Sequence, residues 1–224
     1  MDNTQHISAG DFSAWLKEVR ASLITEAGTE VNCGSCNACC TASYFIHIQP
    51  QETKTLARIN KQLLFPAPGL PKGNVLMGYD EEGRCPMLTD GRCSIYKNRA
   101  ITCRIYDCRV FTAAGIDPGD SDKTLIKKRT DLWAFEYPTP QDWDDHRAVK
   151  AAAAFVKTHA DCFPDGAIPH NPSQLAILAI KVYDVFINDA VTSGKWSNPE
   201  IAQEIIKTNA DFETGRLKSN RQQV

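Results

Sequence analysis

Cysteine is the residue type with the clearest chemical potential in this 224-residue chain, which contains nine cysteines. Eight of them lie close together in the sequence: Cys33, Cys36, Cys39, Cys40, Cys85, Cys93, Cys103 and Cys108. Thiolates bind Zn²⁺ in four-sulfur sites, and they also hold iron–sulfur clusters. Because the N-terminus lacks the basic and apolar segments of an export signal, we expect a reducing compartment, where clustered thiols act as ligands and not as disulfides. All eight are therefore predicted metal ligands.

The spacing of the cysteines bears on which metal they bind. The first four form a C-x2-C-x2-C-C block, and its first three match the start of the bacterial ferredoxin run. The fourth ferredoxin position is Ser43, although Cys85-Pro86 could supply the cysteine–proline pair from elsewhere. Zinc sites usually show two C-x2-C pairs, and only the first block has this form. The pattern slightly favours an iron–sulfur cluster and leaves zinc open.

The second group of cysteines lies in a predicted β-hairpin. Asp90-Gly91 is a typical two-residue hairpin turn, which would pair Leu88 with Cys93 and Cys85 with Tyr96. In a regular hairpin of this register, Cys85 and Cys93 lie on opposite faces. Either the hairpin is irregular, or the two thiolates serve different sites. Eight ligands allow two four-thiolate centres or one centre with spare cysteines, and the sequence does not assign the four members of a site.

Three arginines follow the last predicted ligands. Four thiolates around Zn²⁺ or around a cubane core leave a net charge of about −2. Arg99, Arg104 and Arg109 could offset this charge as hydrogen-bond donors around the site. The ninth cysteine, Cys162, stands alone in the sequence, and we expect a structural or incidental role for it.

Helical periodicity surrounds the cysteine-rich segment. Apolar residues predict an amphipathic helix over residues 10–27, directly before the first cysteines. A short strand is predicted over 44–48, a helix from Pro50 to Leu64, a loop over 65–73 and short strands over 74–96. Further helices are predicted near 120–135, 141–159, 171–191 and 198–212.

These elements predict the fold class. We expect a mainly α protein with a small β-hairpin region, forming a single compact domain over residues 1–224 that is organised around a cysteine-ligated metal centre. Its metal-binding core spans 33–108, and its helical remainder spans 120–212.

Composition narrows the functional classes. A formal net charge of −2 and a pI near 6.2 argue against a nucleic-acid-binding surface. The most apolar stretch, Leu175 to Ile180, is far shorter than the roughly 20 residues that span a bilayer. We therefore expect a cytoplasmic protein without nucleic-acid or membrane partners. A protein partner stays open, and the oligomeric state is not predicted.

The ordered motifs resemble those of the bacterial CxxCxxCC cysteine-cluster proteins. They are Cys33-Gly34-Ser35-Cys36-Asn37-Ala38-Cys39-Cys40, Cys85-Pro86-Met87-Leu88, Asp90-Gly91-Arg92-Cys93-Ser94-Ile95-Tyr96, and then Arg99 with Cys103-Arg104. The resemblance covers about residues 33–108. Ala100 stands where family members commonly have proline. The resemblance implies chelation of zinc or iron, and flagellin lysine methylases carry a related domain.

Two classes of function compete with a simple redox or structural metal centre. The first is a cluster-dependent enzyme, such as a relative of protein lysine methylases. The chain has no Gly-rich nucleotide signature, and its cysteine spacing differs from the C-x3-C-x2-C of radical enzymes that use S-adenosylmethionine. The second is a zinc-stapled protein-interaction module. Enzymatic activity is left open, and no catalytic residue is predicted.

Overall fold

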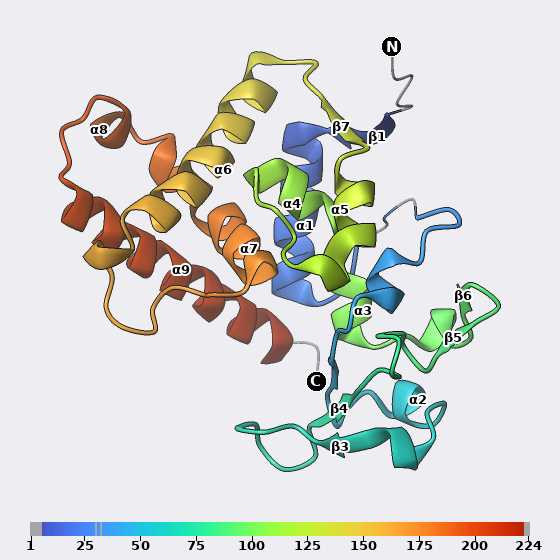
Figure 1. Cartoon of the computed structure of the whole chain (residues 1–224). Helices are drawn as coiled ribbons and strands as arrows, with labels where there is room; N and C mark the ends of the chain where they lie inside the picture. Colours follow the sequence, from blue (N-terminus) through green and yellow to red (C-terminus); the bar gives the residue numbers. More distant parts are fainter. Residues whose placement is uncertain (1–5, 30, 32, 222–224) are drawn as a thin grey trace. The chain divides into compact units, whose positions relative to one another are not determined.

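The computed structural model describes residues 6–29, 31 and 33–221 (Figure 1). About 52% of the chain is helical, with a few small sheets, which confirms the predicted mainly α class. Backbone contacts divide the chain into two compact units. The first comprises residues 1–25, 108–118 and 130–224, and the second comprises 26–107 and 119–129. The predicted boundaries of a 33–108 core and a 120–212 helical remainder stay a prediction.

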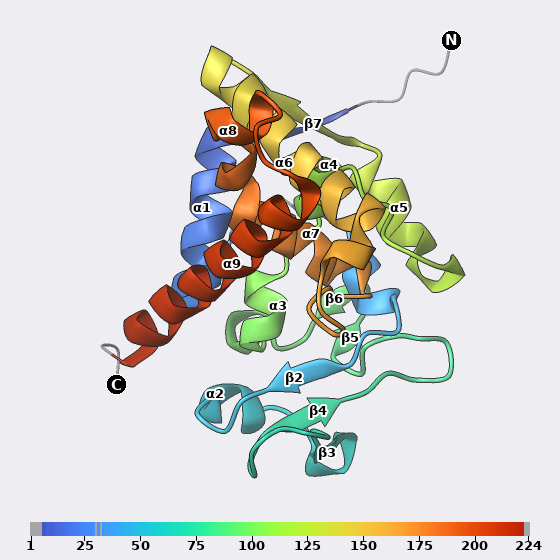
Figure 2. The ribbon, with the colours of Figure 1, turned by 90° about the vertical axis from the view of Figure 1, so that its left-hand side faces the viewer.

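The first unit is built mainly from helices. They are α1 (Phe12–Thr25), α4 (Arg109–Ala114), α6 (Pro140–Thr158), α7 (Pro172–Val182), α8 (Asp189–Thr192) and α9 (Asn198–Arg221). Helix α9 packs along α1 and α7, while α6 contacts α1, α4 and α7 (Figure 2). The side chains buried between them include Phe12, Leu16, Val149, Ile180 and Ile205. The predicted helices at 10–27, 141–159 and 198–212 are confirmed.

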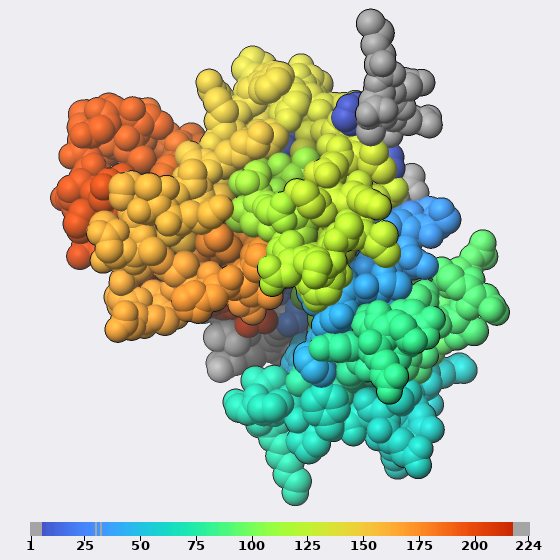
Figure 3. Space-filling view, viewed as in Figure 1, coloured from blue at the N-terminus to red at the C-terminus, as the bar shows by residue number. Residues whose placement is uncertain are grey.

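Helix α6 illustrates why these segments are helical. Thr139 and Asp142 form a capping box, and Pro140 occupies the first turn, where a missing amide costs nothing. Small and β-branched residues such as Ala148, Val149 and Ala152 form the buried face. The opposite face lies at the molecular surface (Figure 3). The Asp142 carboxylate also accepts a hydrogen bond from the Ser13 amide (2.9 Å), which joins this helix start to α1.

A parallel strand pair in the first unit was not predicted. Strand β1 (Ile7–Asp11) pairs with β7 (Trp133–Glu136), with Ile7 opposite Trp133. The predicted helix at 120–135 is therefore wrong at its C-terminal end. Trp133 and Phe135 alternate with more exposed neighbours, the period of a strand, and tertiary pairing decides the conformation.

The second unit contains two small antiparallel sheets. In one, β4 (Val75–Met77) lies between β2 (Ile46–Ile48) and β3 (Leu64–Pro66). The other is the hairpin of β5 (Leu88–Thr89) and β6 (Arg92–Cys93). The helices of this unit are α2 (Thr53–Leu56), α3 (Ile101–Ile105) and α5 (Thr124–Thr130), the last of which ends in the first unit. Ile46, Ile48, Ile59, Met77 and Ala100 form the core, and Cys85 and Cys103 pack against it.

The helix predicted from Pro50 to Leu64 is mostly wrong. Only α2 is helical there, followed by a single tight turn over Lys61–Leu63 that Asn60 caps. Leu64 then opens edge strand β3, where Pro66 is tolerated because one side of the strand needs no amide donor. None of the helices described combines the length and the apolar character that a transmembrane helix requires.

Candidate metal centre

The first cysteine block folds as two successive turns. The Cys36 amide donates to the Cys33 carbonyl (2.8 Å), and Gly34 between them has a left-handed φ of 55°. The Cys40 amide then donates to the Asn37 carbonyl (2.8 Å) in a 3-10 turn. Alternating turns of this kind, unlike a regular helix, let the four thiols of the block point in different directions.

The end of this block is tied to other segments of the same unit. The Lys123 ammonium donates to the Ala42 carbonyl and lies 4.4 Å from the centre of the Tyr44 ring. On the other side, the Cys85 amide donates to the Cys40 carbonyl (2.7 Å). Backbone bonds therefore hold the first cysteine block beside the segment that carries the second.

The hairpin confirms the predicted register at its tip. Leu88 pairs with Cys93, and Asp90 and Gly91 have left-handed φ values of 50° and 73°, as the turn type requires. The predicted pairing of Cys85 with Tyr96 is wrong, because the Leu88 amide donates to the Cys85 carbonyl (2.9 Å) and closes a turn. The hairpin is thus irregular, and Cys85 and Cys93 are not separated onto opposite faces of one ladder.

Backbone amides donate hydrogen bonds to the sulfur atoms of both hairpin cysteines. The Met87 amide donates to Cys85, and the Ile95 amide donates to Cys93; both bonds favour the thiolate and so lower the pKa. Burial acts more strongly in the opposite direction, and the net pKa of each thiol is raised. Two of the predicted ligands are therefore supplied with the amide donors that a bound thiolate needs.

Helix α3 carries Cys103 and is the third cysteine-bearing segment of the second unit. The buried Glu52 carboxylate accepts from the Ile101 amide (2.6 Å) and from the Gln49 amide (2.8 Å), so it caps the start of α3. The Thr102 hydroxyl donates to the His47 carbonyl (2.8 Å). These bonds fix α3 against β2. Sequence reasoning missed Glu52, since no local pattern links it to a helix that starts so much later in the chain.

Four thiols interact electrostatically in every pairwise combination: Cys40, Cys85, Cys93 and Cys103, called the cysteine quartet below. Burial, together with negative charge on Cys85, Cys40 and Cys93, raises the pKa of Cys103 to about 12. Charge on Cys40 likewise raises the pKa of Cys85 and of Cys93, and Cys93 also acts on Cys85. Every pair within the quartet is thus close enough for electrostatic interaction. Four thiolates together repel one another unless a cation lies between them.

The comparisons with known proteins give one match, to a family model. Residues 32–131 match the family model CxxCxxCC, described as "Putative zinc- or iron-chelating domain". This segment is similar to the CxxCxxCC family, and residues 32–131 are called the CxxCxxCC domain below. It contains all eight cysteines predicted as ligands. Among curated proteins and among solved structures, no match to the chain was found.

Three further cysteines of the CxxCxxCC domain form a second group beside the quartet. The Cys39 thiol donates to Cys40, which raises the pKa of Cys39 and lowers that of Cys40. Charge on Cys103 and, less strongly, charge on Cys33 also raise the pKa of Cys39, and charge on Cys36 raises that of Cys33 after the larger effect of burial. Cys39 therefore interacts with two members of the quartet, Cys40 and Cys103, and Cys33 links it to Cys36.

Cys108 is placed differently from the other predicted ligands of the domain. It belongs to the first unit, and its sulfur accepts a hydrogen bond from the Trp133 indole (3.2 Å). Its role as a metal ligand stays a prediction. Cys108 also lies past the last motif of the family resemblance, Cys103-Arg104, but no sequence pattern predicts its contact with the remote Trp133.

Only one of the three predicted arginines has a resolved effect on the thiols. The Arg99 guanidinium lowers the pKa of Cys33, Cys93 and Cys103, against the larger effect of burial. Arg104 donates to the Arg99 carbonyl (3.2 Å). Arg109 is buried in the first unit, where it donates to the Ala9 carbonyl (3.2 Å). Arg99 thus acts on two members of the quartet, while Arg129 acts more strongly than Arg99 on Cys33.

Proposed function

We propose that the CxxCxxCC domain binds one [4Fe–4S] cluster through Cys40, Cys85, Cys93 and Cys103, with a redox or structural role. The observation that carries this proposal is the mutual adjacency of the quartet, whose members come from three separate segments of the second unit. Burial alone gives no reason for four thiols from remote segments to converge. Binding of one metal centre by four thiolates provides such a reason.

The quartet favours a single centre per chain. The remaining thiols of the second unit, Cys33, Cys36 and Cys39, are one short of a four-thiolate set. Cys39 contributes instead a hydrogen bond to Cys40, of the kind that adjusts the electron density on a cluster-bound sulfur.

The spacing of the sulfur atoms favours a cluster over zinc. A zinc ion with four bonds of about 2.3 Å holds its tetrahedral sulfur ligands about 3.8 Å apart. Within the described residues, no three of the domain's thiols have sulfur atoms that all lie within 4.8 Å of one another. In a cubane cluster each thiolate binds a different iron, so the sulfurs lie farther apart than around one ion.

The protein environment suits a buried, negatively charged centre. Cys85 and Cys103 pack against the apolar core of the unit, which limits access of water. The amides of Met87 and Ile95 donate to Cys85 and Cys93, and the charge of Arg99 acts on two members of the quartet. Hydrogen bonds, charge and burial are the factors through which a protein sets the reduction potential of such a cluster. The bound cluster would supply one-electron transfer.

Metal analysis of protein purified without oxygen tests this proposal. We expect about four irons and four inorganic sulfides per chain, with broad visible absorbance. The proposal is contradicted if the protein is colourless and carries one zinc per chain in place of iron. That result would favour the zinc alternative, with a stapling role for the metal.

A further inference from the structure

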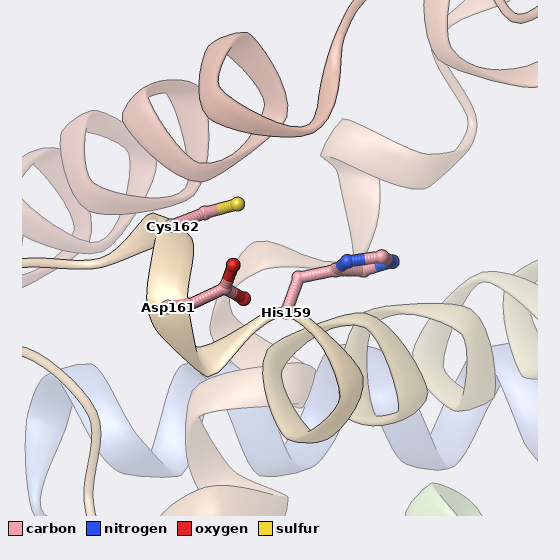
Figure 4. Close-up of side chains that lie close together, drawn as sticks. All are labelled: His159, Asp161 and Cys162. Carbon is pink, nitrogen blue, oxygen red and sulfur yellow. The ribbon is translucent and has the colours of Figure 1, made fainter.

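A second group of potential metal ligands lies outside the CxxCxxCC domain. In the part of the chain that the structure describes, it is the group in which three donors of His, Cys, Asp or Glu lie within 4.8 Å of one another: His159, Asp161 and Cys162. The three side chains extend to the same side of a short turn (Figure 4). All three belong to the first unit, and their sequence lies beyond residue 131, where the family match ends.

Local backbone geometry explains why the three donors meet. Helix α6 ends at Thr158, and the His159 amide still donates to the Phe155 carbonyl (2.9 Å). The chain then tightens into a 3-10 turn, in which the Cys162 amide donates to the His159 carbonyl (3.0 Å). Residues three apart in such a turn project to the same side, so His159 and Cys162 face each other across Asp161.

The electrostatic setting favours a cation. The carbonyl end of the 19-residue helix α6 carries partial negative charge, and His159 directly follows it. The Asp161 side chain is exposed, while His159 and Cys162 are half-buried. An imidazole and a thiolate beside a carboxylate form a donor set suited to Zn²⁺ and similar transition metals and not to Mg²⁺ or Ca²⁺.

A fourth donor is present on helix α9. The Asn198 amide lies 3.2 Å from Nδ1 of His159. The oxygen and nitrogen of an amide exchange places by a half-turn, which would put the Asn198 oxygen at this distance from the ring. Two ligands with bonds of about 2.0 Å to one tetrahedral ion lie about 3.3 Å apart, close to the observed value.

We propose that His159, Asp161, Cys162 and Asn198 form a second metal site, specific for Zn²⁺ and chemically similar ions and independent of the cysteine quartet. A tetrahedral ion needs its donors about 3.3 to 3.8 Å apart, so rotation of the exposed Asp161 side chain and small shifts of the others complete the site. The site joins the end of α6 to the start of α9, so bound metal should also stabilise the first unit.

Cobalt(II) titration of the full-length protein, purified with its cluster, tests this site. We expect one added Co²⁺ per chain, with sulfur-to-cobalt charge-transfer absorbance in the difference spectrum. Cys162→Ser should abolish this absorbance, and Asp161→Asn should weaken Co²⁺ binding about ten-fold or more. Since Asp161 is exposed, its substitution should leave the fold intact.

Matched controls separate this site from the domain. His170→Gln and Asp165→Asn change the same residue types at exposed positions outside the group and should bind Co²⁺ as the wild type does. Iron per chain is measured in the same samples and should not change in Cys162→Ser. Failure of the cluster proposal and failure of the second-site proposal are therefore distinguishable. Cobalt absorbance that survives in Cys162→Ser, or a wild type that binds no added Co²⁺, would overturn the proposal.

Discussion

The backbone amide of Cys85 donates a hydrogen bond to the carbonyl oxygen of Cys40, with 2.7 Å between nitrogen and oxygen. This bond joins the first cysteine block to the segment that leads into the hairpin. It positions two members of the quartet by their backbone, independently of their side chains. The thiols therefore approach one another because the fold requires it, and a metal centre can form on a framework that is already assembled.

Glu52 is predicted to position Cys103. Glu52→Ala removes the acceptor of the Ile101 and Gln49 amides and leaves two donors without a partner in a buried region. We expect the free energy of unfolding to fall by about 1 to 3 kcal/mol, together with a lower iron content. Urea denaturation followed by circular dichroism, with iron analysis, measures both.

Two further variants calibrate this prediction. Glu52→Gln keeps one acceptor oxygen and should lose about half as much stability. Glu82→Ala removes an exposed carboxylate of the same unit and should change neither quantity appreciably. Equal stability of wild type and Glu52→Ala would show that the cap does not support α3.

Gly28 is predicted to be essential because it packs against Arg104, close to the C-terminal end of α3. It has a left-handed φ of 94°, and a Cβ there would lie 3.0 Å from both Cβ and the carbonyl oxygen of Arg104. Gly28→Ala therefore combines backbone strain of about 1 to 2 kcal/mol with a steric clash. Gly69 also has a left-handed φ, 73°, but open space around it, so Gly69→Ala should show the strain alone. Thermal unfolding of the two variants should rank Gly28→Ala as the less stable, and the reverse order would contradict the packing described.

His146 in the first unit is predicted to make stability depend on pH. Burial, together with the charge of Lys150, lowers its pKa to about 4, and Tyr137 contacts Nδ1 at 2.6 Å. Because the unfolded chain binds a proton near pH 6.5 and the folded chain does not, stability is fully present above pH 6.5. It falls by about 3 kcal/mol as the pH drops to about 4.

Nuclear magnetic resonance titration of the histidine rings measures this pKa directly. The His146→Gln variant should lose most of the difference in unfolding free energy between pH 7 and pH 4.5, and His170→Gln should retain it. A His146 ring that titrates near 6.5 in the folded protein would refute the assignment.

Local patterns in the sequence predicted part of this structure well. The Asp90-Gly91 pair specified the hairpin tip and its register, because only certain residues adopt two consecutive left-handed conformations. The density of cysteines indicated a ligand set before any fold was known. Helical periodicity likewise predicted a helix near 141–159, which α6 confirms.

Long-range relationships could not be predicted in the same way. The pairing of Ile7 with Trp133, the cap that Glu52 provides for α3 and the contact of Cys108 with Trp133 all join remote segments. No single-sequence pattern encodes such partners. The group around Cys162 was missed for another reason: the signal H-x-D-C lies within four residues, but a 3-10 turn is needed to bring the donors together.

Substitution of the cysteines in neighbouring pairs tests the central claim most directly. Cys40 and Cys39 are adjacent in sequence, and Cys103 and Cys108 are close, yet only the first of each pair belongs to the quartet. Iron per chain is to be measured in the four Cys→Ser variants, purified without oxygen. The account predicts that Cys40→Ser and Cys103→Ser lose most of the iron while Cys39→Ser and Cys108→Ser retain it. Full iron in Cys40→Ser and Cys103→Ser, or its loss from Cys39→Ser and Cys108→Ser instead, would contradict it.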